Sequence, residues 1–598
     1  MNSRTHTKKT RYFCALLFLV AALGYGQYSI RSQEEIKRFE RIPRETVFLH
    51  YNNSLFLVGE YLYYKMYCLQ GKDLSPSGIS KIGYVELVDK DRNLIFEHKL
   101  LLVSGMGQGD FFIPTTVPSG NYKLIGYTRW MLNNSENRFF SANITIVNPY
   151  DQLPKTTLSQ EKGESKPVPD TEESGIGAPS SKKGSASGVH LESDKVLYGK
   201  RERVSLKIKN TSDLPVGGNY SISVRKKYMP KGQSPITATH FFNESLKDSG
   251  HEKFVEGPIY LPELRGELIC GSVLSKTNSV PLARQVLGIT FLGENPLAYI
   301  LRTNKQGLFY CNLGPSNRKS TTILQVLGEN RSQGHIVLHP LPKPSYADLE
   351  FKALAIPPDS NPSLLQRSIY NQVENAFLQQ KADSMVQIDF PLPVYHKLSE
   401  TYILDDYKRF KTLKETVTEI IKGGVILRKV KGKEKLFIRD KENYFLNPEN
   451  APLVLVDGII LEDISELIAY DIRGVKDIGI SRHDYFIGPK RYKGMVSVHT
   501  KNQDFVPSTG GNRMQRIQIP SPVTTKVYRF QDYAQKTQLE RIPDYRHQLF
   551  WDPDIVLEKK ETSLVFYTSD NVGEYEIVLE GFTAQGRAIS VSKAIQVH

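Results

Sequence analysis

The stretch that most constrains the fold is residues 451–502, APLVLVDGIILEDISELIAYDIRGVKDIGISRHDYFIGPKRYKGMVSVHTKN. A short, apolar and β-branched run at 453–456 predicts a strand, and Asp457 with Gly458 predicts a turn directly after it. Three apolar residues at helical spacing follow, Ile464, Leu467 and Ile468. Two more strand-like runs complete the stretch, residues 475–481 and 495–500. This order predicts a compact α+β unit.

The same stretch resembles the plug domain of TonB-dependent outer-membrane receptors, in which a P-x-V-x-V-D-G strand and turn precede a helix and a G-x-I-x-V strand. Residues 452–458 match the first motif and residues 494–498 match the second. A plug normally fills a barrel of about 22 strands, each of roughly ten residues. Fewer than 100 residues follow Asn502, so we expect any such barrel to be made by another chain.

The N-terminus has the layout of a secretory signal peptide, with cleavage expected after residue 26. Four cations precede an apolar run at 13–23: Arg4, Lys8, Lys9 and Arg11. Loss of these four charges lowers the formal net charge from +14 to +10. The apolar run is shorter than the roughly 20 residues of a membrane span, and an uncleaved anchor is the alternative. We expect an exported protein of a Gram-negative bacterium, in the periplasm or on the periplasmic face of the outer membrane.

Two sandwich segments flank a stretch that is poor in large apolar side chains. Residues 43–150 alternate short strand-like runs with Gly, Asn, Asp and Pro turns, which is typical of a β-sandwich. They resemble a macroglobulin domain at residues 57–60 and 119–124. A second Ig-like or macroglobulin module resumes at Val189, although residues 229–258 are polar and predict a loop. The Ser-, Lys- and Pro-rich segment between the two sandwiches predicts a flexible linker.

A third β segment resembles the carboxypeptidase-regulatory-like sandwich, which has no catalytic residues of its own. The matching segments are residues 265–273, 281–283 and 303–309. Apolar residues then follow a helical period over 363–383 and again over 405–421. The basic run at 428–435 lies between two strand-like stretches, so we expect a solvated hairpin tip and no nucleic-acid partner.

The predicted fold class is mainly β with one α+β unit, built from tandem Ig-like or macroglobulin β-sandwiches. The predicted parts in order are a signal peptide at 1–26, a macroglobulin-like sandwich at 43–150, a linker at 151–188, a second Ig-like module at 189–258, a carboxypeptidase-regulatory-like sandwich at 259–345, a helical connector at 346–394, a plug-like domain at 395–503, a connector at 504–529 and a short C-terminal β domain at 530–598.

No pattern in the sequence predicts a catalytic, cofactor or metal site. Walker, GxGxxG and HExxH motifs are absent from the sequence. His335 and His339 have the spacing of zinc ligands on a helix, but their strand-like surroundings would place them about 13 Å apart. Residues 89–93 resemble a calcium loop, yet Leu94 and Leu100 stand where an EF-hand needs Gly and Glu. We expect a hairpin turn there.

The cysteines limit the chemistry further. Cys68, Cys270 and Cys311 follow the leader, and an odd number is not the pattern of a disulfide scaffold. Cys270 and Cys311 fall in strands of one predicted domain, where they could pair or remain buried thiols. The thioester of macroglobulin protease traps needs Cys-Gly-Glu-Gln, whereas Cys68 is followed by Leu-Gln-Gly. We therefore expect no thioester.

These observations predict a non-catalytic scaffold or binding protein, peripheral to the outer membrane and without a cofactor. We expect its plug-like unit to dock on an outer-membrane barrel, or on a transport, secretion or assembly complex made by other chains. The alternative is a carbohydrate- or peptide-binding module of the cell envelope without a barrel partner. The 32 tyrosines could supply stacking rings for such a ligand, although tyrosine is also ordinary strand material.

Overall fold

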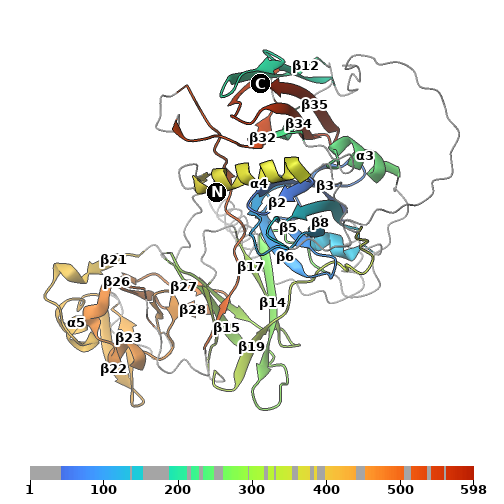
Figure 1. Ribbon diagram of the computed structural model, residues 1–598. Helices are drawn as coiled ribbons and strands as arrows, with labels where there is room; N and C mark the ends of the chain where they lie inside the picture. The colour runs from blue at the N-terminus through green and yellow to red at the C-terminus, as the bar shows by residue number, and fades with distance from the viewer. Residues whose placement is uncertain are drawn as a thin grey trace, which may run out of the picture. The chain divides into compact units, whose positions relative to one another are not determined.

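The computed structural model describes residues 42–134, 138–151, 188–211, 217–227, 234–247, 260–293, 295–314, 321–328, 331–352, 361–377, 383–386, 398–439, 451–503, 505, 514–534, 541–557 and 560–598. The predicted signal peptide and nearly all of the predicted linker at 151–188 lie outside these residues. As predicted, the fold is mainly β (Figure 1). In the described part of the chain, no helix is both long and apolar enough to cross a membrane.

The chain forms two compact units. We call one the mixed unit; it is made of Arg265–Leu341 and Ile388–Ser521. The other, the sandwich unit, is made of Ile36–Leu264, Pro342–Gln387 and Pro522–His598. Each unit is therefore assembled from segments that are far apart in the sequence.

The first sandwich of the sandwich unit matches the prediction for residues 43–150. Its two sheets pack closely, because Gly126 brings one backbone against Val47 and Leu49 of the other sheet. One sheet contains β1 (Glu45–Tyr51), β3 (Tyr61–Gln70), β4 (Ser75–Pro76) and β7 (Met106–Phe112). The other contains β2 (Leu55–Leu57), β9 (Phe140–Val147), β8 (Gly120–Tyr127), β5 (Ile82–Val88) and β6 (Leu94–Leu101).

A second sandwich, which we call the composite sandwich, combines two segments predicted as separate domains, 189–258 and 530–598. One sheet contains β10 (Val189–Ser193), β12 (Arg203–Asn210) and β33 (Glu561–Tyr567). The other contains β11 (Leu197–Tyr198), β35 (Ala588–Val597), β34 (Gly573–Thr583), β13 (Gly218–Lys226) and β32 (Gln548–Val556). The prediction of two domains was wrong because alternation of apolar residues identifies a strand but not its partner. Apolar residues from both segments form one core.

Two helices in the sandwich unit pack against these strands. The first, α3 (Ala238–Lys247), lies in the segment predicted as a loop, and its Ala238 is fully buried. The second, α4 (Asn361–Ala376), confirms the predicted helical connector, although it ends before Asp383. Figure 1 shows α4 between the first sandwich and the strands of the composite sandwich. Its Tyr370 ring stacks on Tyr545 at 4.2 Å.

Helix α4 is fastened to the first sandwich by a buried ion pair. Arg367, only 3% exposed, donates hydrogen bonds to both carboxylate oxygens of Glu60 at 2.7 Å and to the Leu55 carbonyl oxygen at 3.0 Å. Asn371 and Asn375 of α4 donate to the carbonyl oxygens of the same turn. The turn predicted at 57–60 is therefore the docking point of the helix.

In the mixed unit, the segment predicted as a carboxypeptidase-regulatory-like domain does form a two-sheet sandwich, here called the middle sandwich. One sheet contains β17 (Leu308–Leu313), β14 (Glu267–Ser275) and β19 (Gly334–Leu338). The other contains β16 (Leu297–Arg302), β15 (Val286–Phe291), β18 (Thr321–Val326) and β30 (Met514–Gln518). Strand β30 corrects the prediction of a bare connector at 504–529, since it adds an edge strand to β18.

The rest of the mixed unit is the α+β module, and its order of elements agrees with the prediction for 451–502. Its main sheet runs β21 (Glu400–Ile403), β26 (Val475–Ser481), β29 (Met495–Thr500), β24 (Leu453–Val456) and β25 (Ile459–Ile460). Helices α5 (Leu413–Glu419) and α6 (Ser465–Ala469) contribute apolar side chains to the core on one face of this sheet. The helix predicted at 405–421 is thus shorter than expected.

The Asp457–Gly458 turn explains why the module closes at this point. Both residues have positive φ, 48° and 82°, as a tight hairpin turn requires. A side chain at Gly458 would collide with Pro296 of the middle sandwich. Asp457 accepts hydrogen bonds from the backbone N–H of Thr500 at 2.8 Å and of Phe505 at 3.1 Å. The turn therefore joins β24, the end of β29 and the middle sandwich.

We predict that Arg367→Ala destabilises the sandwich unit by about 3–5 kcal/mol, because it leaves the buried Glu60 carboxylate without its counter-ion. Urea unfolding followed by tryptophan fluorescence measures this, since Trp130 and Trp551, the only tryptophans, both lie in the sandwich unit. The control is Gln366→Ala, an exposed neighbour on α4, which should leave the unfolding midpoint nearly unchanged. Equal midpoints for the two variants would contradict the prediction.

A second prediction concerns the buried carboxyl of Glu580. Burial raises the pKa of Glu580 from 4.5 to about 8. Between these pH values the folded protein keeps a proton that the unfolded protein releases, so the contribution of Glu580 to stability falls as pH rises. Glu580→Gln cannot titrate. Its free energy of unfolding relative to wild type should therefore increase from pH 5 to pH 8 in urea titrations.

The control for this pH effect is Glu574→Gln, an exposed carboxylate on the same strand, β34. Its difference from wild type should change little between the two pH values. A Glu580→Gln difference that stays constant with pH would show that this carboxyl does not titrate as inferred.

Candidate functional site

The α+β module exposes an aromatic ring at the end of a short hairpin. Strands β27 (Tyr485–Ile487) and β28 (Lys490–Tyr492) form the hairpin, and Phe486 on it is 74% exposed. The Arg491 guanidinium lies 5.8 Å from the centre of the Phe486 ring. On the other side of the hairpin, Tyr485 and Tyr492 are buried in the core shared with the middle sandwich. The hairpin is thus held firmly while its outer face is open.

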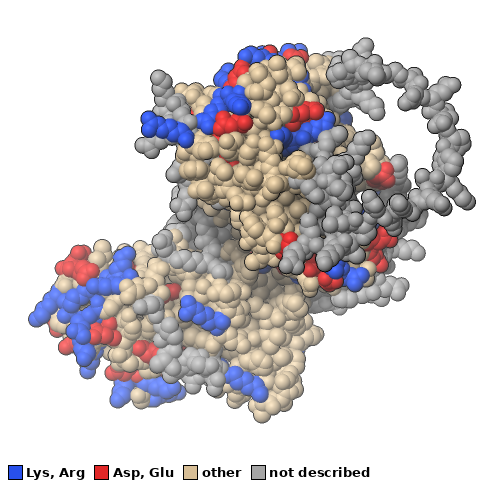
Figure 2. Space-filling model, in the orientation of Figure 1, with Lys and Arg blue, Asp and Glu red and all other residues tan. Residues whose placement is uncertain are grey.

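A second hairpin of the module carries exposed cations, as predicted for residues 428–435. It consists of β22 (Val425–Val430) and β23 (Lys433–Ile438), with Lys431 and Gly432 in positive-φ turn positions. Its exposed cations are Arg428, Lys429, Lys431 and Lys433. Figure 2 shows Lys and Arg side chains gathered over α5, β22 and β23, with a few acidic residues between them. Among the described residues, no ion pair is formed by these four side chains.

The sheet of the α+β module also holds a Ser–His–Asp row, which the sequence analysis did not identify. The His499 Nδ1 atom lies 2.6 Å from the Asp477 Oδ1 atom, and His499 Nε2 lies 3.2 Å from the Ser497 Oγ atom. Ser497 and His499 share one face of β29 because side chains two apart on a strand point the same way. A Ser-x-His spacing within a strand was the only sequence signal, and Asp477 lies on the neighbouring β26.

This row has the order of a hydrolase triad, but its surroundings do not suit acyl transfer. Such a reaction needs backbone N–H groups that point at the developing oxyanion. Ser497 lies on a central strand, paired with Leu455 of β24 on one side and Gly479 of β26 on the other. The backbone around Ser497 is therefore used in hydrogen bonds to the two neighbouring strands. Ser497 itself is only 7% exposed.

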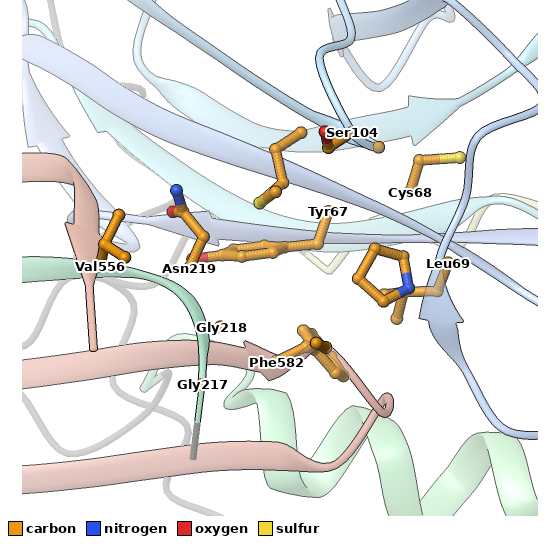
Figure 3. Close-up of a pocket in the computed structure, with 13 residues that line it drawn as sticks. Tyr67, Cys68, Leu69, Ser104, Gly217, Gly218, Asn219, Val556 and Phe582 are labelled. Carbon is orange, nitrogen blue, oxygen red and sulfur yellow. The ribbon is translucent and has the colours of Figure 1, made fainter. Parts of the chain in front are cut away.

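An apolar cleft of about 540 Å³ lies where the first and composite sandwiches meet. Figure 3 shows Tyr67 and Phe582 among the residues that line it, and their ring centres are 5.5 Å apart. Leu69, Met106 and Val556 also line the cleft. Its lining suits an apolar group and offers little for catalysis.

Cys68 borders this cleft but is not placed to react. Its side chain is 0% exposed, and burial together with the Glu45 carboxylate raises the pKa of the thiol well above its usual value. A thiol with a raised pKa holds its proton and is a poor nucleophile. This agrees with the absence of the thioester motif from the sequence.

Three other candidates from the sequence can be placed. His335 lies on strand β19 and His339 just after it, as the strand-like surroundings predicted. Asp89 forms a hairpin turn, in which its Oδ1 atom accepts hydrogen bonds from the N–H groups of Asp91 and Asn93. Within the described residues, no group of three or more His, Cys, Asp or Glu side chains could hold a metal ion.

The possible pairing of Cys270 with Cys311 does not occur. The strand register places Cys270 opposite Tyr310 and Cys311 opposite Ile269. Because side chains alternate along a strand, the two sulfur atoms lie on opposite faces of the sheet, with Cys311 in the core. The described cysteines form no disulfide.

No protein-family model matches the chain, and no curated protein matches it. Solved structures with some likeness include Salmonella alpha-2-macroglobulin reacted with methylamine, at 10% identity and a TM-score of 0.22, covering 92% of this chain and 39% of that one. Native Escherichia coli alpha-2-macroglobulin has 10% identity and a TM-score of 0.23, covering 93% and 40%. The Yersinia pseudotuberculosis adhesin InvE has 9% identity and a TM-score of 0.13, covering 50% and 60%.

The chain thus spans about two fifths of the length of these macroglobulins. Likenesses with such low TM-scores do not establish a shared fold, and they do not test the plug-like or carboxypeptidase-regulatory-like resemblance. The sheets and contacts of this chain therefore carry the functional argument.

Proposed function

We propose that this chain is a non-catalytic binding protein of the bacterial cell envelope, whose α+β module docks on the periplasmic side of an outer-membrane barrel or of a complex made by other chains. The observation that carries the proposal is the exposed Phe486 on a rigid hairpin. Exposed aromatic and arginine side chains on a firm support are typical of the residues that dominate protein interfaces.

The unpaired cations of the β22–β23 hairpin support an acidic partner surface. Complementary charge raises the rate of association and selects the partner more than it adds affinity. Lys431 and Lys433 on this hairpin would steer the approach, and Phe486 would supply apolar contact once the partner is bound. The leader-like sequence at 1–26 supports export, which would bring the chain to the compartment where such a partner is accessible.

The Ser–His–Asp row does not argue for a catalytic role in place of binding. His499 is hydrogen-bonded on both ring nitrogens, and Ser497 lies within a fully paired part of the sheet. Its hydrogen bonds satisfy polar side chains on a partly covered face of the sheet, and no catalytic role is needed to explain them. We therefore propose no hydrolytic activity for this chain.

Photocrosslinking in intact cells tests the docking proposal. A p-benzoylphenylalanine residue at Phe486 should give adducts with an outer-membrane barrel protein, identified by mass spectrometry. The matched control is the same group at Phe530, an exposed ring of the sandwich unit, which should not give this adduct. Lys431→Glu with Lys433→Glu should weaken the Phe486 adduct severalfold. Adducts from Phe486 to soluble proteins or glycans alone would overturn the docking proposal.

The absence of hydrolytic activity is tested with p-nitrophenyl acetate and the purified full chain. We expect the rate of ester hydrolysis to be the same for wild type and for Ser497→Ala, because the row lacks an oxyanion-binding site. A rate that falls to background only in Ser497→Ala would show that the row is catalytic.

A further inference from the structure

A second cleft, in the sandwich unit, has the composition of a small-molecule site. It encloses about 460 Å³ between the first sandwich, the composite sandwich and α4, within the range typical of ligand sites. The residues that matter for the argument line this aromatic cleft: Tyr61, Tyr63, Tyr528, Trp551, His547 and Lys226. All of them lie outside the module that the docking proposal uses.

The cleft is built around a row of parallel rings. Tyr61 stacks on Tyr63 with ring centres 5.6 Å apart and an angle of 16° between the ring planes. Tyr63 in turn stacks on Trp551 at 5.9 Å and 23°. The ring of Tyr528 meets Tyr63 edge-on at 5.2 Å. Tyr63 is thus stacked against both Tyr61 and Trp551, so Tyr61 at the end of the row is the ring on which a flat ligand can stack.

Two ring nitrogens of the cleft residues lack a hydrogen-bond partner. The Trp551 Nε1 atom and the His547 Nε2 atom are both buried and unpaired among the described residues, and Trp551 as a whole is only 4% exposed. A buried polar atom without a partner is costly. The indole N–H can only donate. Burial, helped by Arg367 and Lys226, lowers the pKa of His547 well below 6.5, so its ring is neutral and can donate or accept.

The cleft also contains a cation without an acidic partner. The Lys226 Nζ atom donates to the amide oxygen of Asn571 at 2.6 Å, and in the described part of the chain no carboxylate lies within ion-pair distance of it. Four other cations that line the cleft form ion pairs: Arg225 with Glu576, Arg367 with Glu60, Lys526 with Asp110 and Arg546 with Asp544. Lys226 therefore offers a positive charge to a ligand.

A carboxylate that lines the cleft, Asp383, lies near the tyrosines. Asp383 accepts a hydrogen bond from the Arg529 backbone N–H at 2.8 Å. Burial raises the pKa of Tyr63, and the Asp383 charge adds to this shift. After burial and Arg367, Lys226 is the third cause that lowers the pKa of His547. The cleft thus combines a hydroxyl-accepting carboxylate beside stacking rings with a separate cation beside unpaired ring nitrogens.

We propose that the aromatic cleft binds a saccharide that carries a carboxylate. The apolar face of a sugar ring would stack on Tyr61, its hydroxyl groups would bond to the Trp551 and His547 nitrogens, and its carboxylate would lie near Lys226. An apolar peptide side chain would leave both nitrogens unpaired. A phosphate dianion is a poorer match, because Arg225, Arg367 and Arg546 already bind carboxylates and Arg529 lies near the Asp383 carboxylate.

This site gives a location and a ligand class to the carbohydrate alternative raised by the tyrosine content of the sequence. It does not depend on the docking function, and either proposal can fail without the other. An exported protein with both features would hold a saccharide through one unit and a protein partner through the other.

The test uses the purified full chain and two probes of similar size, digalacturonic acid and uncharged digalactose. Calorimetry and the fluorescence of Trp551 report binding. We expect saturable binding of digalacturonic acid, at least tenfold tighter than digalactose. Lys226→Met should remove this preference while leaving the weak binding of digalactose. Tyr61→Ala should weaken both probes, because it removes a stacking ring.

The matched control is Lys227→Met, the next lysine along the chain, which is exposed and pairs with Glu574 at 3.0 Å. It should bind both probes like wild type. Absence of binding to wild type at 10 mM of either probe would overturn the proposal. So would equal affinities for the two probes, or binding that neither Lys226→Met nor Tyr61→Ala changes. The intrinsic fluorescence and urea midpoint of each variant confirm that it is folded.

Discussion

The pairing of β13 with β32 and β34 is the constraint on which the arrangement of the chain depends. Ser223 of β13 and Gln548 of β32 are hydrogen-bonded at 2.9 Å although they are 325 residues apart. The composite sandwich therefore closes only when two remote segments meet. The segment of the chain between β13 and β32, which includes α4 and the mixed unit, therefore begins and ends at the composite sandwich.

Polar contacts reinforce the joint between the first and composite sandwiches. The buried Lys65 amine donates to the carbonyl oxygens of Tyr220 and Pro553, and the Tyr67 hydroxyl lies 2.9 Å from the Ser221 hydroxyl. Burial lowers the pKa of Lys65 to about 7. These buried polar groups are tolerated because they have hydrogen-bond partners. They favour one relative placement of the two sandwiches, since any other placement would leave them unpaired. Both clefts are lined by residues of the first and composite sandwiches.

Much of the fold could be predicted where the signal was local. The Asp457–Gly458 turn, the strand at 453–456 and the basic hairpin follow from turn chemistry and alternation, and the structure has them at the expected residues. Which strands pair with one another could not be predicted in the same way. The strand at 514–518 lies in a Pro- and Gly-containing segment, and only its pairing with β18 makes it a strand.

The candidate sites show the same limit more strongly. Tyr61, Lys226 and Trp551 are distributed along the chain without a motif, so their common cleft is a consequence of tertiary structure alone. The Ser–His–Asp row needed the register between β26 and β29 to become visible. Residue types were evident from the sequence, whereas their distances were not.

The closure of the composite sandwich has a consequence for biosynthesis. While the chain is being made or exported, β13 emerges long before β32 and β34, and β12, which pairs with β10, emerges long before β33. Strand edges therefore lack strand partners during that interval. Unpaired strand edges of this kind are sites of aggregation, and contacts of long sequence separation form slowly. The protein is thus prone to aggregation until these strands are paired. A chaperone that covers apolar strands during this time would increase the yield of folded molecules.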